Sequence, residues 1–154
     1  MLSRYKNFAK LSLEERRLFW EAYRTLGVMR LLIMTVSFKR LTRSLDQVAQ
    51  KRDIPPLSID ERDIAERVGA AIGRASAHTP WESACLVQSL TARQMLQKRE
   101  IPGVFYIGVA KDQESEAKIR AHAWSQCGEK IITGGKGHEN FTVLSVFGWG
   151  CKAL

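Results

Sequence analysis

Two short stretches, TPWESACL (residues 79–86) and RAHAW (residues 120–124), decide how this chain is interpreted. Thr79 and Glu82 have the spacing of a capping box, and Pro80 suits the first position of a helix, so the first stretch predicts a helix that begins at Pro80. The second stretch predicts a strand. A cysteine near a helix N-terminus and an imidazole beside it both favour the thiolate, which is the nucleophilic form of the thiol. A helical cysteine followed by a strand histidine therefore predicts a thiol–imidazole site, provided that the two side chains meet.

Length and composition place the chain among single-domain globular proteins. It has 154 residues, of which 45% are hydrophobic and 26% charged, a balance typical of soluble domains. The longest apolar run, residues 26–38, is interrupted by Arg30 and falls short of the roughly 20 residues that span a bilayer. Since the N-terminus also lacks a signal-peptide pattern, we expect a cytoplasmic protein.

The three cysteines are Cys85, Cys127 and Cys151. An odd count without metal-type spacing predicts neither a disulfide framework nor a metal site, and no motif predicts a cofactor. A reactive thiol among the three is the remaining expectation.

The positive charge is concentrated at one end of the chain. Residues 1–52 contain 12 Lys/Arg and 4 Asp/Glu, whereas residues 53–154 contain 12 of each. This predicts a cationic helical surface that could meet an acidic protein or peptide, anionic lipid or nucleic acid. No sheet with interleaved basic and aromatic residues is predicted, so we expect no nucleic-acid partner. Membrane contact is possible but not expected.

Capping boxes at Ser12–Glu15 and Ser58–Glu61 begin two further helices. Proline cannot continue a helix, so Ile54-Pro55-Pro56-Leu57 marks a linker over residues 52–57. This divides the chain into a basic helical segment, 1–57, and a second domain, 58–154. Helices are predicted over residues 13–37 with a break or bend near Gly27, 39–51, 59–75 and 80–99.

The hydrophobic period changes after residue 100, and strands replace helices. Strands are predicted over residues 104–109, 120–127, 130–133 and 141–147. The second and third form a hairpin around Gly128, and Trp149 is expected to pack on the core. The fold class is therefore α+β: N-terminal helices and a cysteine-bearing helix packed on an antiparallel meander of about four strands.

Cys85 and His122 are the candidate catalytic pair, although each has an ordinary alternative. Cysteine is often just a small buried apolar side chain, and a lone strand histidine is often structural. Together they are more informative, because they come in the expected order and on the expected elements.

Other groups could complete this pair. A third group would orient the histidine ring, but the next strand, residues 130–133, has no carboxylate or amide. Glu139 and Asn140, in the loop beyond it, are the side-chain candidates. The amide of Gln88 and the backbone N–H of Cys85 are candidate oxyanion donors, although Gln88 also fits an ordinary surface position.

Two tryptophans are candidates for substrate binding. Trp81 lies four residues before Cys85 and would share its helix face, and Trp124 lies two residues after His122 and would share its strand face. His138, in a glycine-rich loop, is expected to be exposed.

The second half of the chain resembles the leader-peptidase family of lasso-peptide biosynthesis, a transglutaminase-like cysteine protease domain. The resemblance covers residues 79–147, and the N-terminal helices also look like those of its stand-alone members. The matching features are Thr79-Pro80-Trp81 before Cys85-Leu86, Arg93 and Leu96 running into Ile101-Pro102, Ile107-Gly108-Val109, Ala121-His122-Ala123-Trp124, Thr133-Gly134-Gly135 and Phe141-Thr142-Val143.

The resemblance implies removal of a leader peptide from a ribosomally made precursor, after which an ATP-dependent cyclase uses the new amino terminus. It implies Cys85 as the nucleophile and His122 as the general base. Many relatives have an aspartate on the strand after the histidine, whereas this chain has Ile132-Thr133-Gly134-Gly135 there. The site would then work as a dyad, or a backbone carbonyl, Glu139 or Asn140 would orient the ring.

Some relatives carry a fused leader-recognition domain of roughly 80 residues. Residues 1–57 are too few and too helical for it, so we expect recognition by a separate protein. The basic helices could dock that protein, the leader or the cyclase, or could only pack on the protease. Two other functions stay open: a transglutaminase-like acyltransferase that uses the same pair, and a non-catalytic peptide-binding adaptor.

Overall fold

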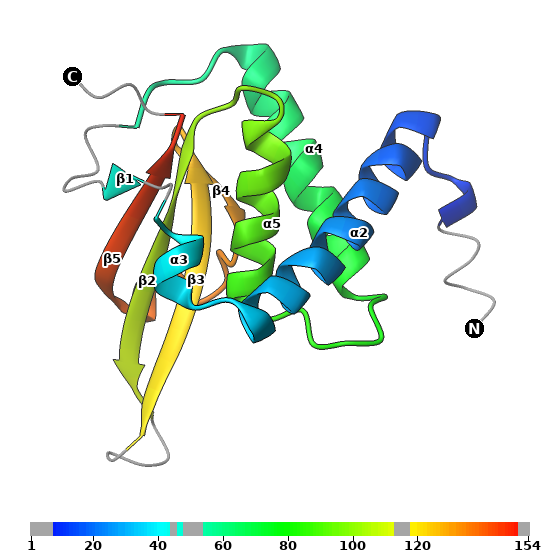
Figure 1. The fold of residues 1–154 in the computed structure, drawn as a ribbon. Helices are drawn as coiled ribbons and strands as arrows, with labels where there is room; N and C mark the ends of the chain where they lie inside the picture. The colour runs from blue at the N-terminus through cyan, green and yellow to red at the C-terminus, as the bar shows by residue number, and fades with distance from the viewer. Residues whose placement is uncertain (1–7, 44–45, 48–53, 113–117, 151–154) are drawn as a thin grey trace.

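The computed structural model describes residues 8–43, 46–47, 54–112 and 118–150, which form helices on one face of an antiparallel sheet (Figure 1). This confirms the predicted α+β class. The helices are α2 (Leu13–Thr35), α3 (Phe38–Leu41), α4 (Ile59–Ser76), α5 (Cys85–Gln97) and the short 3-10 helix η2 (His138–Asn140). The strands are β1 (Asp46–Gln47), β2 (Gly103–Lys111), β3 (Ile119–Cys127), β4 (Lys130–Thr133) and β5 (Thr142–Trp149).

The sheet has the order β1-β5-β2-β3-β4, and every neighbouring pair is antiparallel. The hairpin of β3 and β4 around Gly128 is confirmed. The prediction of a four-strand meander is wrong, because β5 crosses back to pair with β2 instead of β4. Burial explains this choice, since it stacks Phe147 on Phe105 with ring centroids 5.1 Å apart and seats Trp149 in the core.

The two capping boxes at Ser12 and Ser58 are confirmed, with both reciprocal hydrogen bonds in each. The predicted break near Gly27 is wrong, because α2 continues through it without interruption. A Cβ at this position would lie 3.3 Å from the ring of Trp81, so the glycine leaves room for a tryptophan to pack against the helix.

The predicted helix over residues 39–51 is also wrong. Only α3, a single helical turn, forms there, and Asp46 and Gln47 pair with Gly148 and Phe147 of β5. The unpaired backbone groups of β5 form hydrogen bonds with this segment, and helix propensity carries no information about such pairing. The part of the prediction over residues 48–51 lies outside the described residues.

The sheet buries a different set of side chains on each face. The larger core lies between the helices and the inner face of the sheet, and it includes Leu26, Ile72, Leu96 and Phe105. A smaller cluster of Val104, Tyr106 and Trp124 lies on the outer face, away from these helices. Each face therefore takes alternate residues of β2 and β3.

Glu21 of α2 and Arg99, just after α5, form a bidentate ion pair that joins two helices of the larger core. Arg99 donates to the two carboxylate oxygens at 3.0 and 2.7 Å, and both side chains are about three-quarters buried. This hydrogen bonding holds the pKa of Glu21 below its usual value.

Replacing Glu21 with Gln should lower the free energy of unfolding by about 1 kcal/mol near neutral pH, because one charge-assisted pair is lost. A carboxylate with a lowered folded pKa stabilises the fold above its unfolded pKa, and that contribution is lost as the pH falls through the folded pKa. The difference in unfolding free energy between wild type and Glu21→Gln should therefore become smaller in acid. Urea unfolding at several pH values measures it, and a gap that is constant with pH would contradict the assignment. Glu129→Gln, at an exposed position, is the matched control.

Two glycines give a matched test of core packing. A Cβ on Gly103 would overlap the Trp149 ring and lie 2.7 Å from Cys127 Sγ, so Gly103→Ala should cost about 2–3 kcal/mol of stability. A Cβ on Gly73, inside α4, meets nothing within 4 Å, so Gly73→Ala should instead stabilise by about 0.5–1 kcal/mol. Thermal unfolding of both variants measures these changes, and equal effects would show that the packing around Gly103 is not tight.

Candidate functional site

Cys85 is the first residue of α5, rather than a residue of its second turn. The helix was predicted to begin at Pro80, and this is wrong: its N-cap is Ala84. The hydroxyl of Thr79, expected to cap it, instead contacts the carbonyl oxygens of Ser76 and Trp81 at 3.1 and 3.0 Å. These local hydrogen bonds hold the residues after Thr79 in a loop, and the helix therefore begins about one turn later than predicted.

The N-terminus of α5 has no side-chain cap. The serine caps of α2 and α4 occupy backbone N–H groups of the first turn, whereas Ala84 has no side-chain oxygen with which to do so. The N–H groups around Cys85 therefore lack a side-chain acceptor within the helix. Such groups, at the positive end of the helix dipole, can stabilise negative charge on a thiolate or an oxyanion.

A buried chain of hydroxyls fixes α5 over the end of the β3–β4 hairpin. Ser89 Oγ lies 3.3 Å from Thr133 Oγ1, which lies 2.7 Å from Ser125 Oγ. Cys85 precedes Ser89 by four residues and so lies on the same sheet-facing side, one turn nearer the helix N-terminus. The C-terminal end of α5 leads into Gly103, so its N-terminus points to the opposite end of the sheet (Figure 1).

His122 lies on the outer face of the sheet. It is three residues from Ser125 in a regular strand, and residues an odd number apart point to opposite faces. Its ring stacks on Trp124 at 5.8 Å between centroids and tilts against Phe141 at 5.0 Å. The imidazole is thus held by the aromatic cluster on the outer face.

The hydrogen-bond partner of His122 is a backbone carbonyl. Its Nε2 lies 2.7 Å from the carbonyl oxygen of Gly134, which can only accept, so Nε2 carries the proton. Gly134 has φ +70°, and a Cβ there would overlap the carbonyl oxygen of Ala123. Only glycine fits this close approach, and in the neutral ring Nδ1 remains an acceptor.

Cys85 and His122 lie on opposite faces of the sheet, and each is connected to the end of β4. Gly134 follows Thr133, and Cys85 lies one turn from Ser89, the partner of Thr133. No hydrogen bond joins Cys85 and His122 within the described chain. The pairing of β3 with β4 ends at Ser125, so the stretch of β3 around His122 does not pair with β4.

The other candidate residues have different surroundings. Gln88 donates its side-chain amide to the Ser83 carbonyl at 2.8 Å, which closes the loop before α5. Glu139 lies 3.3 Å from His138 and is mostly exposed, and Asn140 is exposed in η2. Among the described residues neither is hydrogen-bonded to His122.

The two tryptophans lie on opposite sides of the molecule. Trp81 is not on α5 but packs against α2, with its ring 5.4 Å from Tyr23. Its indole N–H is buried and has no partner in the described part of the protein. Trp124 is only 4% exposed and stacks on Tyr106 at 5.3 Å, so its ring is part of the outer cluster rather than an open surface.

The model of the transglutaminase-like superfamily matches residues 28–146, which is most of the chain. The chain belongs to this superfamily. Its members are usually cysteine-dependent enzymes, either proteases or acyltransferases, and the helix-borne Cys85 agrees with that general class. No curated protein and no solved structure matches the chain. Within the described residues, no helix is long and apolar enough to cross a membrane.

His138 was expected to be exposed, but it is a partly buried member of the site region of this transglutaminase-like domain. Its ring lies 5.5 Å from Trp124, and Nδ1 lies 2.6 Å from the carbonyl oxygen of Gly135. Gly137, with φ +76°, turns the loop back onto the sheet. The glycine-rich spacing was the signal that could have indicated this return.

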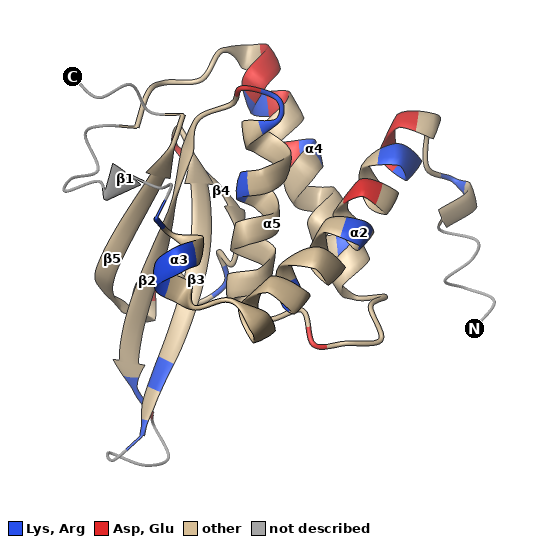
Figure 2. Ribbon diagram, in the orientation of Figure 1, with Lys and Arg blue, Asp and Glu red and all other residues tan. Residues whose placement is uncertain are grey.

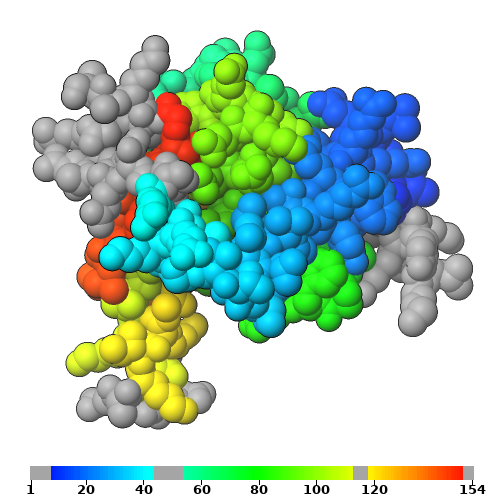
Figure 3. Space-filling view, viewed as in Figure 1, coloured from blue at the N-terminus to red at the C-terminus, as the bar shows by residue number. Residues whose placement is uncertain are grey.

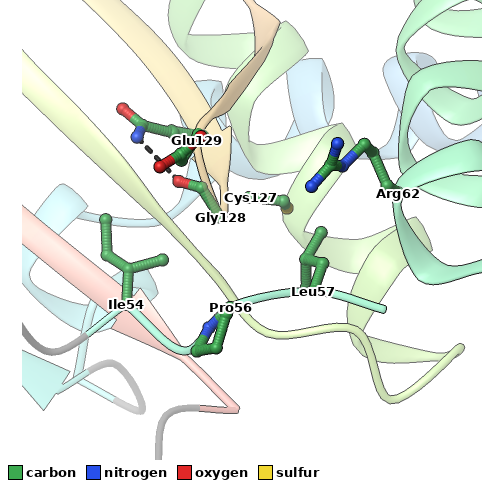
Figure 4. Close-up of a pocket in the computed structure, with 8 residues that line it drawn as sticks. Ile54, Pro56, Leu57, Arg62, Cys127, Gly128 and Glu129 are labelled. Carbon is green, nitrogen blue, oxygen red and sulfur yellow. Dashed lines mark hydrogen bonds between the residues drawn. The ribbon is translucent and has the colours of Figure 1, made fainter. Parts of the chain in front are cut away.

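A cavity of about 560 Å³ lies at the other end of β3 (Figure 4). It separates the segment from Ile54 to Leu57 from the hairpin turn at Gly128, and Arg62 borders it. None of the predicted site residues lines it, so the cavity does not coincide with the Cys85 region.

The two described thiols should differ sharply in reactivity. Cys85 is partly exposed, whereas Cys127 is fully buried. In native protein, iodoacetamide should alkylate Cys85 and leave Cys127 unmodified until the protein unfolds, and mass spectrometry of the tryptic peptides separates the sites, including Cys151. Modification of Cys127 as fast as Cys85 would contradict this assignment.

Proposed function

We propose that this chain is a cysteine peptidase with Cys85 as its nucleophile. The observation that carries the proposal is the position of Cys85 as the first residue of an uncapped helix in a transglutaminase-like domain. A thiolate there is placed to attack a peptide carbonyl, and the backbone N–H of Cys85 can donate to the resulting oxyanion. In this proposal the catalytic residues lie within 58–154, and α2 of the basic segment 1–57 packs in the core of the same domain.

In the proposed reaction the Cys85 sulfur bonds to the carbonyl carbon and the peptide C–N bond breaks. His122 takes the thiol proton and passes it to the departing amine, and water then hydrolyses the thioester to release a carboxylate and restore the thiol. Gly134 takes the place of the third catalytic residue, because its carbonyl accepts from Nε2 and leaves Nδ1 as the base. Glu139 and Asn140 are not needed for this role. His122 would reach Cys85 around the edge of β3 beyond the end of β4.

The proposed substrate is the precursor of a lasso peptide, from which the enzyme removes the leader. This follows from the resemblance of residues 79–147 to the leader peptidases. A separate leader-recognition protein would deliver the precursor, and an ATP-dependent cyclase would consume the product. We place the reaction in the cytoplasm, where thiols are kept reduced.

A non-catalytic peptide-binding adaptor is the second candidate. One observation favours it: His122 is packed among outer-face aromatics and is not hydrogen-bonded to Cys85. In an adaptor, Cys85 would be dispensable for function.

Cleavage of a candidate precursor, mixed with its recognition protein, tests the proposal by mass spectrometry. Wild type should give one cut with a free carboxylate, Cys85→Ala should give none, and His122→Ala should be slower by about 100-fold or more. Gln97→Ala, at the end of α5 away from the site, is the matched control and should cleave normally.

Three other outcomes have distinct meanings. Equal cleavage by wild type and Cys85→Ala would remove Cys85 as the nucleophile. An amide formed with an added amine, in place of the carboxylate, would identify an acyltransferase. Precursor binding without cleavage, unchanged in Cys85→Ala, would identify an adaptor.

A further inference from the structure

One side of α2 carries an outward stripe of apolar and arginine side chains. We call it the α2 stripe; its members are Leu13, Arg17, Trp20, Arg24, Val28, Leu31 and Met34. They recur every three or four residues, so they lie on one side of the helix, opposite the buried residues Leu18, Ala22 and Leu26. The five apolar members are 50–75% exposed.

The exposure of this stripe is not explained by folding. The opposite side of α2 already supplies the contacts to α4 and α5, and the helix lies along the surface of the molecule (Figure 3). Scattered exposed apolar residues are normal, whereas several exposed apolar residues gathered on one side of a helix mark a candidate interaction site. Trp, Met and Arg are also enriched at protein interfaces.

The charge beside the stripe is positive. A groove of about 530 Å³ runs along its first half, with Leu13 and Trp20 as apolar walls and Arg17, Arg24 and Lys98 as cations around it. Arg17 and Arg24 make no ion pair with any residue in the described part of the chain. The one carboxylate in the groove, Glu21, is already held by Arg99. Along the ribbon of α2 as a whole, basic segments in blue alternate with acidic ones in red (Figure 2).

We propose that the α2 stripe docks an acidic amphipathic helix of a partner protein. Apolar residues at three- and four-residue spacing suit a helix laid alongside α2, and carboxylates on that helix would pair with Arg17 and Arg24. The stripe is long enough for this, since 22 residues of helix span about 33 Å. The partner is thus recognised by charge and by apolar anchors, independently of the chemistry at Cys85.

The same geometry disfavours two other occupants of the stripe, a second copy of this chain and a membrane surface. Two copies of the stripe packed against each other would leave Arg17 and Arg24 without a carboxylate partner, because no member of the stripe is acidic. Helices that lie on membranes keep basic residues on a polar side and apolar ones on the opposite side, whereas here arginines interrupt the apolar row. A groove between α2 and Lys98 also suits a narrow segment better than a flat bilayer.

A peptide selection tests this proposal. The probe is a displayed library of 21-residue helical peptides with leucine fixed at the three- and four-residue spacing and Glu, Lys, Gln or Ser at all other positions. Full-length protein should enrich glutamate over lysine, and fluorescence anisotropy of the enriched peptides gives their Kd. Arg17→Glu/Arg24→Glu should weaken binding by about tenfold or more, and Leu31→Ser by several-fold.

Matched controls separate the stripe from general charge and hydrophobicity. Arg43→Glu/Arg62→Glu makes the same change in net charge at two exposed positions off the stripe, and Ile59→Ser removes an apolar side chain that is 84% exposed. Both should bind like wild type. Circular dichroism checks that every variant is folded.

Several results would overturn the proposal. These are no enrichment, enrichment of lysine, or equal loss of binding in the control variants. Stripe-dependent binding to phosphatidylserine vesicles without peptide binding would assign the surface to membranes. A wild-type dimer that the stripe variants dissociate, seen by sedimentation equilibrium, would assign it to self-association. Because cleavage is not the readout, failure here leaves the proposed peptidase activity untouched.

Discussion

The position of the candidate nucleophile depends on a chain of buried hydroxyls. Ser89, Thr133 and Ser125 come from α5, β4 and β3, and their side chains are hydrogen-bonded in series and almost completely buried. A buried hydroxyl without a partner costs free energy, so sliding or turning the helix would be unfavourable. Apolar packing alone would tolerate such shifts more readily. The hydroxyl chain therefore fixes Cys85 over the end of the hairpin.

The two faces of the sheet have separate tasks. The inner face receives the helices and with them Cys85, whereas the outer face holds His122 among Trp124, Phe141 and His138. The Gly134 carbonyl contacts His122 just after the end of β4, where β3 no longer pairs with β4. The strand after His122 has no carboxylate, and the carbonyl of Gly134 accepts the hydrogen bond instead. Only a glycine fits so close to β3 at this position.

α2 is part of the folded domain rather than a separate segment. One side of α2 packs in the main core and is joined to the end of α5 by Glu21 and Arg99. The other side presents the α2 stripe. A single helix can therefore stabilise the domain and recognise a partner, because its two sides are separate surfaces.

Local sequence signals predicted the elements that have strong local causes. The serine capping boxes gave the starts of α2 and α4, and the change of hydrophobic period after residue 100 gave the α+β class. The pairing of a helical cysteine with a strand histidine indicated the transglutaminase-like superfamily, to which the chain belongs. The capping boxes and the hydrophobic patterns depend on residues within a few positions of one another, and the order of Cys85 and His122 is a matter of sequence alone, so these features can be seen in the chain by itself.

Only the tertiary structure decided which distant groups meet. It replaced a predicted helix by β1 through pairing with β5, and it placed β5 beside β2. It also put His122 on the outer face with a backbone partner at Gly134. Each outcome depends on burial or on hydrogen bonds between segments that are distant in the sequence. Residue spacing alone does not contain that information.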